Sequence, residues 1–76
     1  MKDLLTHIVR ELVDKPEEVS VAAVEGNQTS VLELTVAKED IGKVIGKHGR
    51  TAQAIRKIIS SVSAKEKKRT VFEIMD

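Results

Sequence analysis

The sequence predicts an α+β fold with elements in the order helix, strand, strand, helix, helix, strand. Three patterns indicate it: two long stretches with apolar residues at helical spacing, short alternating stretches between and after them, and a Gly-x-x-Gly segment separating two helices. With 76 residues, the chain is expected to form a single domain, residues 1–76, with a thin hydrophobic core.

The first helix is expected over residues 3–14. Its apolar residues form one stripe along the helix: Leu4, Leu5, Ile8, Val9, Leu12 and Val13. Asp3 is expected to cap the N-terminus, and the helix should stop by Lys15 because the residue before a proline, here Pro16, avoids the helical region. His7 lies off the stripe and is expected to be exposed.

Two strands are expected over residues 18–25 and 29–37, joined by a hairpin at Gly26-Asn27. The inward face of the first strand stays open, because its alternation is weak. The second strand has an apolar face and a partly polar face: Leu32, Leu34 and Val36 against Val31, Glu33 and Thr35. This pattern favours a sheet with helices on one side and water on the other.

A short helix is expected over residues 38–45, with Gly46 at its C-terminal end, followed by a longer helix from Arg50 to Ala64. The segment Lys65–Arg69 is expected to be a solvated connector to a last strand, residues 70–75. The core positions expected here are Ala52, Ile55, Ile59 and Val62 on the helix and Phe72 and Ile74 on the strand. The long connection permits parallel pairing of the last two strands.

Charge is unevenly distributed along the chain despite a net charge of +1. Residues 1–40 carry four Lys/Arg and nine Asp/Glu, whereas residues 41–76 carry nine Lys/Arg and three Asp/Glu. The split indicates one acidic and one basic face, and the basic half suits a polyanionic partner. Phe72 is the only aromatic residue, so a nucleic-acid site would use backbone, aliphatic surface and charge rather than stacking on aromatic rings.

Missing residue types and motifs exclude several classes of protein. The chain has no cysteine and no apolar run near the roughly 20 residues of a membrane span, and its N-terminus lacks the apolar core of a signal peptide. His7 and His48 lie in separate elements, and no nucleophile motif or metal-ligand spacing occurs. The phosphate-loop and dinucleotide patterns fail because residue 47 is Lys and residue 44 is Val. We expect a cytoplasmic, non-catalytic protein without cofactor or metal.

The most informative segment is Gly46-Lys47-His48-Gly49, inside the run Ile41–Arg50. Two glycines spaced by two residues let the backbone turn sharply without a Cβ. Basic residues between and after them place positive charge at this turn, just before a helix N-terminus, where a phosphate is favoured. The segment therefore predicts a nucleic-acid site.

The chain resembles a K-homology (KH) domain of the second, prokaryotic type. The resemblance rests on Ile41-Gly42-Lys43-Val44-Ile45-Gly46-Lys47-His48-Gly49-Arg50-Thr51, on the helix at either side of the loop and on the order of elements along nearly the whole chain. A free-standing KH domain of this length resembles the small bacterial KhpA-type RNA-binding proteins. The resemblance implies a three-stranded mixed sheet with three helices on one face, and single-stranded RNA as the ligand.

The resemblance also implies a site of about four nucleotides with the Gly-x-x-Gly loop against the sugar-phosphate backbone. The loop residues expected to bind RNA are Gly46, Lys47, His48, Gly49 and Arg50. Gly42 and Lys43 should border the groove, with Gly42 leaving room for a base or serving only helix packing. Ile45 should offer aliphatic surface, and the second strand should form the opposite wall. Replacing Gly46 and Gly49 by aspartate is expected to abolish RNA binding with the fold intact.

Several alternatives stay open at this stage. The chain could act as a post-transcriptional regulator or RNA chaperone, paired with a larger KH-containing protein or with itself, because a single weak site gains from avidity. It could instead be a protein–protein adaptor or dimerisation module with secondary RNA binding. Single-stranded DNA is a third reading, since a loop that contacts the backbone suits either polymer. Arg56 and Lys57 are as readily solvated residues as ligand contacts.

Overall fold

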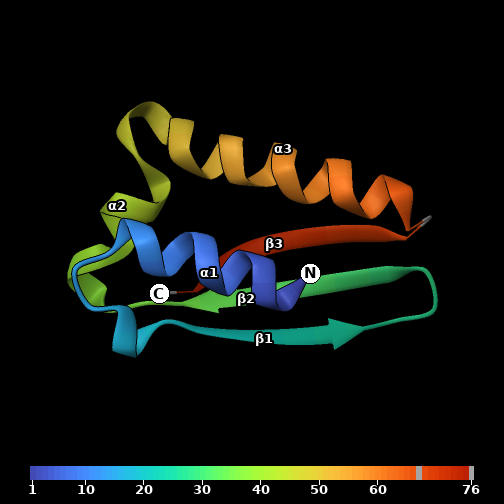
Figure 1. The fold of residues 1–76 in the computed structure, drawn as a ribbon, viewed down its shortest axis with the longest axis horizontal. Helices are drawn as coiled ribbons and strands as arrows, with labels where there is room; N and C mark the ends of the chain where they lie inside the picture. Colours follow the sequence, from blue (N-terminus) through green and yellow to red (C-terminus); the bar gives the residue numbers. More distant parts are fainter. Residues whose placement is uncertain (67, 76) are drawn as a thin grey trace.

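A computed structural model describes residues 1–66 and 68–75 and confirms the predicted α+β fold. Three α-helices cover one face of a three-stranded sheet, in the order α-β-β-α-α-β (Figure 1). The helices are α1 (Lys2–Leu12), α2 (Ile41–Ile45) and α3 (Arg50–Lys65), the strands are β1 (Ser20–Glu25), β2 (Thr29–Thr35) and β3 (Arg69–Met75), and single 3-10 turns are η1 (Pro16–Glu18), η2 (Lys38–Asp40) and η3 (Lys47–Gly49).

The boundaries of α1 differ from the prediction. Met1, not Asp3, occupies the N-cap position, and it makes no side-chain hydrogen bond there. Asp3 lies in the first turn, where its negative charge interacts favourably with the positive end of the helix dipole. The helix ends at Leu12, ahead of the proline, because Val13 is already extended. His7 is exposed, as predicted.

The sheet has the order β1-β2-β3, with β2 in the centre. β1 and β2 pair antiparallel through the predicted hairpin, where the N–H of Gly26 donates to the carbonyl of Thr29 (N···O 2.7 Å). β2 and β3 pair parallel, as the long helical connection allows. β3 is therefore an edge strand, and β2 has both of its edges occupied.

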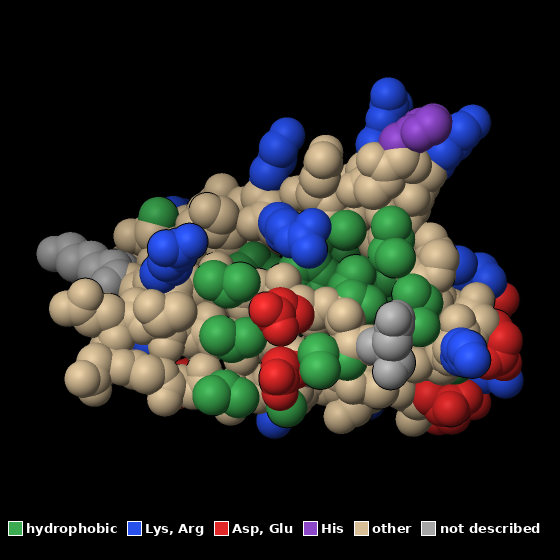
Figure 2. Space-filling view, turned by 180° about the vertical axis from the view of Figure 1, so that it is seen from behind, with side chains coloured by type: hydrophobic (Ala, Val, Ile, Leu, Met, Phe, Trp, Pro, Cys, Tyr) green, Lys and Arg blue, Asp and Glu red, His purple; other side chains and the backbone are tan. Residues whose placement is uncertain are grey.

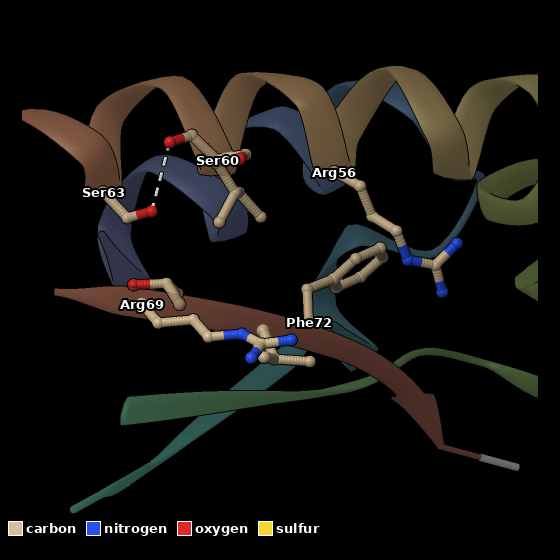
Figure 3. A pocket seen from close by; sticks show the side chains of 8 residues that line it. Arg56, Ser60, Ser63, Arg69 and Phe72 are labelled. Carbon is tan, nitrogen blue, oxygen red and sulfur yellow. Dashed lines mark hydrogen bonds between the residues drawn. The ribbon is translucent and has the colours of Figure 1, made fainter. Parts of the chain in front are cut away.

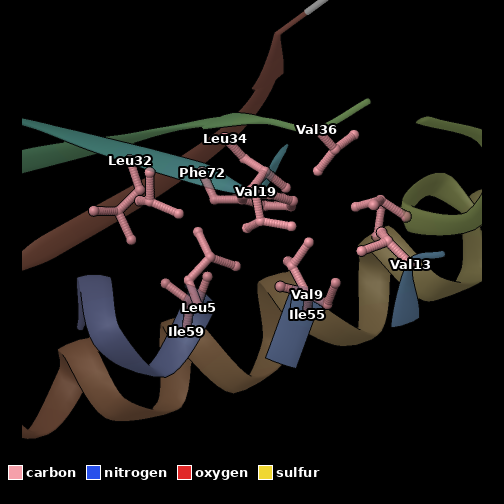
Figure 4. Packing of buried hydrophobic residues seen from close by; sticks show 13 residues of the cluster. Leu5, Val9, Val13, Val19, Leu32, Leu34, Val36, Ile55, Ile59 and Phe72 are labelled. Carbon is pink, nitrogen blue, oxygen red and sulfur yellow. The ribbon is translucent and has the colours of Figure 1, made fainter. Parts of the chain in front are cut away.

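The core lies between the sheet and the helices α1 and α3 (Figure 4). Leu5 and Val9 of α1 and Leu34 of β2 have no exposed surface. Val21 of β1 is buried as well, so the face of β1 that carries Val21 points into the core, which the sequence left open. The predicted faces of β2 and of Phe72 are confirmed, while Ile74 is half-buried and packs against the core.

One predicted core position on α3 is wrong. Val62 is only half-buried, and the buried position is Ser63, whose hydroxyl donates to the carbonyl of Ser60 (O···O 3.2 Å). This internal hydrogen bond satisfies the hydroxyl and lets a polar side chain face the sheet.

The connector between α3 and β3 is shorter than predicted. Lys65 still belongs to the helix and Arg69 already to the strand, while Lys68 pairs with Glu25 (3.3 Å). Lys67, part of the predicted connector, lies outside the described residues. Across residues 1–66 and 68–75, every helix is too short or too polar to cross a membrane.

Candidate nucleic-acid interface

The segment between α2 and α3 is a tight reversal held by positive backbone torsions. The φ angles are +77° at Gly46, +57° at His48 and +72° at Gly49. The N–H of Gly46 donates to the carbonyl of Gly42 (2.9 Å) and the N–H of Gly49 to the carbonyl of Gly46 (3.1 Å). Glycine adopts such angles without a steric penalty, and histidine is among the few other residues that tolerate them, so the residue types explain the turn.

The two glycines of the loop have different surroundings. A Cβ built at Gly46 would lie 2.2 Å from Oγ1 and 2.8 Å from the backbone N of Thr51, whereas one at Gly49 would meet nothing within 4 Å. Gly46 thus lets α2 approach the start of α3, and Gly49 leaves open space beside the chain. A side chain at Gly46 would overlap Thr51, so we now expect the double aspartate variant to disturb the loop rather than to leave the fold intact.

Positive charge gathers at this loop and projects from one corner of the molecule (Figure 2). Lys47, His48 and Arg50 are exposed, and within the described part of the chain none of them has an ion-pair partner. Unpaired cations beside a backbone without side chains suit a phosphate group.

Lys43, another predicted contact, has a different environment. Its Nζ lies 2.9 Å from Oδ2 of Asp14 and 3.6 Å from Oδ1 of Asp40, and the hydrogen bond to Asp14 raises the pKa of Lys43 above its usual value. These carboxylates compensate its charge, so Lys43 offers less attraction to a phosphate than Lys47 or Arg50.

The remaining predicted residues lie on α2, next to the loop. A Cβ at Gly42 would meet nothing within 4 Å, so helix packing does not require a glycine there. Ile45 is 40% exposed, whereas its neighbour Val44 has no exposed surface. Ile45 thus provides the expected aliphatic surface, and Val44 anchors α2 to the core.

Sequence reasoning misplaced the second wall of the groove. The strand beside α3 is the edge strand β3, because β2 is enclosed between β1 and β3. A pocket of about 250 Å³ lies between α3 and β3, with Arg56 on one wall and Arg69 on the other (Figure 3). From the sequence, Arg56 was as readily a solvated residue as a ligand contact, and Arg69 was expected in the solvated connector before the last strand.

A buried carboxylate holds α2 and the loop in place. Asp40 is 1% exposed and accepts hydrogen bonds from the backbone N–H groups of Asp14 (3.3 Å) and Lys15 (3.0 Å). These bonds fasten the segment after α1 to the residue that precedes α2. The sequence placed Asp40 only in the first turn of a helix, since a contact 25 residues away leaves no local pattern.

Replacing Asp40 by alanine is expected to destabilise the protein by about 1–3 kcal/mol, because two partly buried backbone donors lose their acceptor. Urea unfolding followed by circular dichroism measures the change. The matched control is Glu39→Gln, which breaks only the exposed ion pair with Lys15 (2.6 Å) and is expected to leave the unfolding midpoint unchanged. Equal midpoints for Asp40→Ala and the unmodified protein would contradict this role of Asp40.

The fold and the loop together define a KH domain of the second type, and comparison with known proteins identifies the family. The family model of the KhpA/KhpB KH domain matches residues 2–74. The chain therefore belongs to the KhpA/KhpB KH-domain family, which is non-enzymatic, in agreement with the expectation from the sequence.

Curated relatives match over almost their whole length. The chain is 56% identical to RNA-binding protein KhpA of Clostridium acetobutylicum, covering 99% of this chain and 100% of that protein. It is 53% identical to RNA-binding protein KhpA of Chlamydia trachomatis (100% and 97%) and 43% identical to that of Borreliella burgdorferi (97% and 90%). No solved structure matches the chain.

Proposed function

We propose that this protein binds single-stranded RNA, about four nucleotides at a time, with its Gly46–Gly49 loop against the sugar-phosphate backbone. The observation that carries the proposal is the exposed cationic reversal, in which Lys47, His48 and Arg50 flank the open space at Gly49. The relatives named RNA-binding protein KhpA support the same ligand.

The loop would bind the phosphates through its backbone and its charges. With no side chain at Gly49, a phosphate can approach the main chain, and Lys47 and Arg50 can donate charge-assisted hydrogen bonds to it. Gly42 leaves space beside α2, and the exposed face of Ile45 gives a base an aliphatic surface. None of these contacts reads a base edge, so weak sequence preference is expected.

Weak binding by a single small site favours a role together with a second RNA-binding chain. Two linked sites on one strand raise the overall affinity without new contacts at either site. We infer that the protein acts in the cytoplasm as a post-transcriptional regulator or RNA chaperone, paired with a larger KH-containing protein or with a second copy of itself.

The salt dependence of binding tests the backbone mechanism. If three or four phosphates are neutralised, the logarithm of the association constant should fall with the logarithm of salt concentration with a slope of about −2 to −3. Fluorescence anisotropy of an end-labelled oligoribonucleotide measures it, because the chain has neither Trp nor Tyr. A slope near zero would contradict binding through phosphates, and a deoxyribonucleotide of the same sequence tests the preference for RNA.

The adaptor reading makes a different prediction. A dimerisation module should have the same mass with and without RNA and bind its protein partner equally well in both conditions. Size-exclusion chromatography with light scattering, run with and without an oligoribonucleotide, separates this reading from RNA binding.

A further inference from the structure

The edge strand β1 lacks the residues that usually protect the border of a sheet. It stands at one end of the order β1-β2-β3 and forms the border of the sheet in Figure 1. Natural edge strands are commonly protected by lysine, proline or a bulge, because an open edge pairs with other chains. β1 contains neither lysine nor proline, and its register with β2 runs unbroken from Ser20 to Glu25.

The backbone of β1 has hydrogen-bonding groups that point away from the sheet. The N–H of Gly26 donates to the carbonyl of Thr29, so these two residues form a hydrogen-bonded pair, and such pairs alternate along an antiparallel ladder. The alternation directs the N–H and C=O groups of Val21, Ala23 and Glu25 toward the free side of β1. In the part of the chain that the structure describes, no other segment supplies these groups with a hydrogen-bond partner. They form a ladder to which an extended chain can add.

The side of the sheet away from the helices carries two neighbouring carboxylates. Glu33 of β2 and Glu73 of β3 are register partners and face away from the buried side chains of Leu34 and Phe72. Acidic side chains lie among hydrophobic ones on this open face (Figure 2). Like charges on directly neighbouring strands repel each other, and among the described residues neither carboxylate has an ion-pair partner. The acidic pair therefore lacks a cation.

Ala22 connects this acidic pair with the free edge of β1. Ala22 is the register partner of Glu33, so one row across the sheet contains Ala22, Glu33 and Glu73. Strands lie about 4.8 Å apart, so a residue beside Ala22 on an added strand would have its Cα about 10 Å from that of Glu33. The stem of a lysine or arginine can cross the methyl group of Ala22 and bring its charge to Glu33. The next row begins with Val24, which is 56% exposed and suits an apolar residue.

We propose that the free edge of β1 is a docking site for an extended segment of another protein, which adds a fourth strand to the sheet. The segment carries a lysine or arginine beside Ala22, whose charge offsets the repulsion between Glu33 and Glu73, and an apolar residue beside Val24. The two carboxylates repel RNA, so the partner is a protein. A second copy of β1 does not fit, because Ser20–Glu25 has no basic residue to place in the acidic row. The proposal concerns a surface that the proposed function does not use, and it does not depend on RNA binding.

A synthetic peptide of sequence Thr-Val-Thr-Lys-Thr-Val-Thr, blocked at both ends, tests the docking site. It is symmetric about its lysine, so it presents the same residue types to the edge in either strand direction. NMR titration of the 15N-labelled full chain should give the largest amide shift changes at Val21, Ala23 and Glu25. At a peptide concentration ten times its Kd, hydrogen exchange of these three amides should slow about tenfold, because they acquire acceptors. A peptide with glutamate in place of the lysine should bind at least about tenfold more weakly.

Protein variants separate the acidic row from the backbone ladder. Glu33→Gln combined with Glu73→Gln should reduce the preference for the lysine peptide over the glutamate peptide to less than about threefold. Glu11→Gln combined with Glu17→Gln is the matched control, because both are exposed carboxylates outside the sheet, and it should keep the full preference. Ala23→Pro removes one edge-facing N–H without altering the pairing with β2 and should abolish peptide binding. A peptide methylated on its backbone nitrogens makes the same test on the unmodified protein and should not bind.

The outcomes that overturn the docking site differ from those that overturn RNA binding at the loop. Unchanged β1 amides at millimolar lysine peptide, or equal binding of the lysine and glutamate peptides, would refute the proposal. Protection of the same amides without peptide, together with a dimer mass by light scattering, would assign the edge to a second copy of this chain instead. Shift changes at these amides on addition of an oligoribonucleotide would assign it to RNA. Failure of RNA to bind the loop would refute the proposed function and leave the peptide results unaffected.

Discussion

Replacing Lys47 and His48 together by aspartate is expected to weaken RNA binding about a hundredfold, because two charge-assisted contacts of about 1.5 kcal/mol each are lost. The fold should be unaffected. Both side chains are exposed, and aspartate tolerates the φ of +57° at His48. Anisotropy with a labelled oligoribonucleotide measures the affinity, and thermal unfolding checks the fold.

The control for this variant is a charge reversal elsewhere on the surface. Lys2→Asp combined with Lys38→Asp alters the net charge at least as much, at two exposed positions outside the loop. It should weaken binding only slightly, through the long-range field. Equal losses in the two double variants would show that overall charge, and not the loop, attracts the RNA.

Replacing Gly46 by alanine is expected to destabilise the protein by at least about 3 kcal/mol, because its Cβ would overlap Thr51 and its torsions of +77° and 171° are almost exclusive to glycine. Gly49→Ala should cost only about 1–2 kcal/mol, since it faces open space and only its φ of +72° is unfavourable. Urea unfolding of both variants measures the difference.

The contrast between the two glycines has a functional counterpart. Gly49→Ala should retain the fold and reduce RNA affinity, because the added methyl group occupies the space through which a phosphate approaches. Gly46→Ala should lose binding through disruption of the loop. Equal stability of the two alanine variants would contradict the packing role of Gly46.

The elements themselves were predictable because their signals are local. The apolar stripe of α1, the alternation of β2 and the glycine pair each depend on residues within one element, and the backbone torsions at Gly46 and Gly49 explain the motif. The length of the helical connection permitted parallel pairing of the last two strands, and β2 and β3 do pair in parallel.

The features that sequence reasoning missed depend on contacts between distant segments. Asp40 bonds to the backbone 25 residues earlier, Lys43 is compensated by Asp14, and Arg56 covers a ring that lies 16 positions later. No periodicity or motif marks such pairs, because each partner alone has the pattern of an ordinary surface residue. Of these contacts, the pairing of Lys43 with Asp14 compensates a cation of α2.

The most direct test of the central claim is a titration of the 15N-labelled protein with a four-nucleotide RNA, followed by NMR. Binding at the loop predicts that the largest amide shift changes fall on Gly46–Arg50 and Ile45, while the exposed side of the sheet around Glu33 and Glu73 is unchanged. Large changes on that face of the sheet, with the loop amides unaffected, would contradict the account.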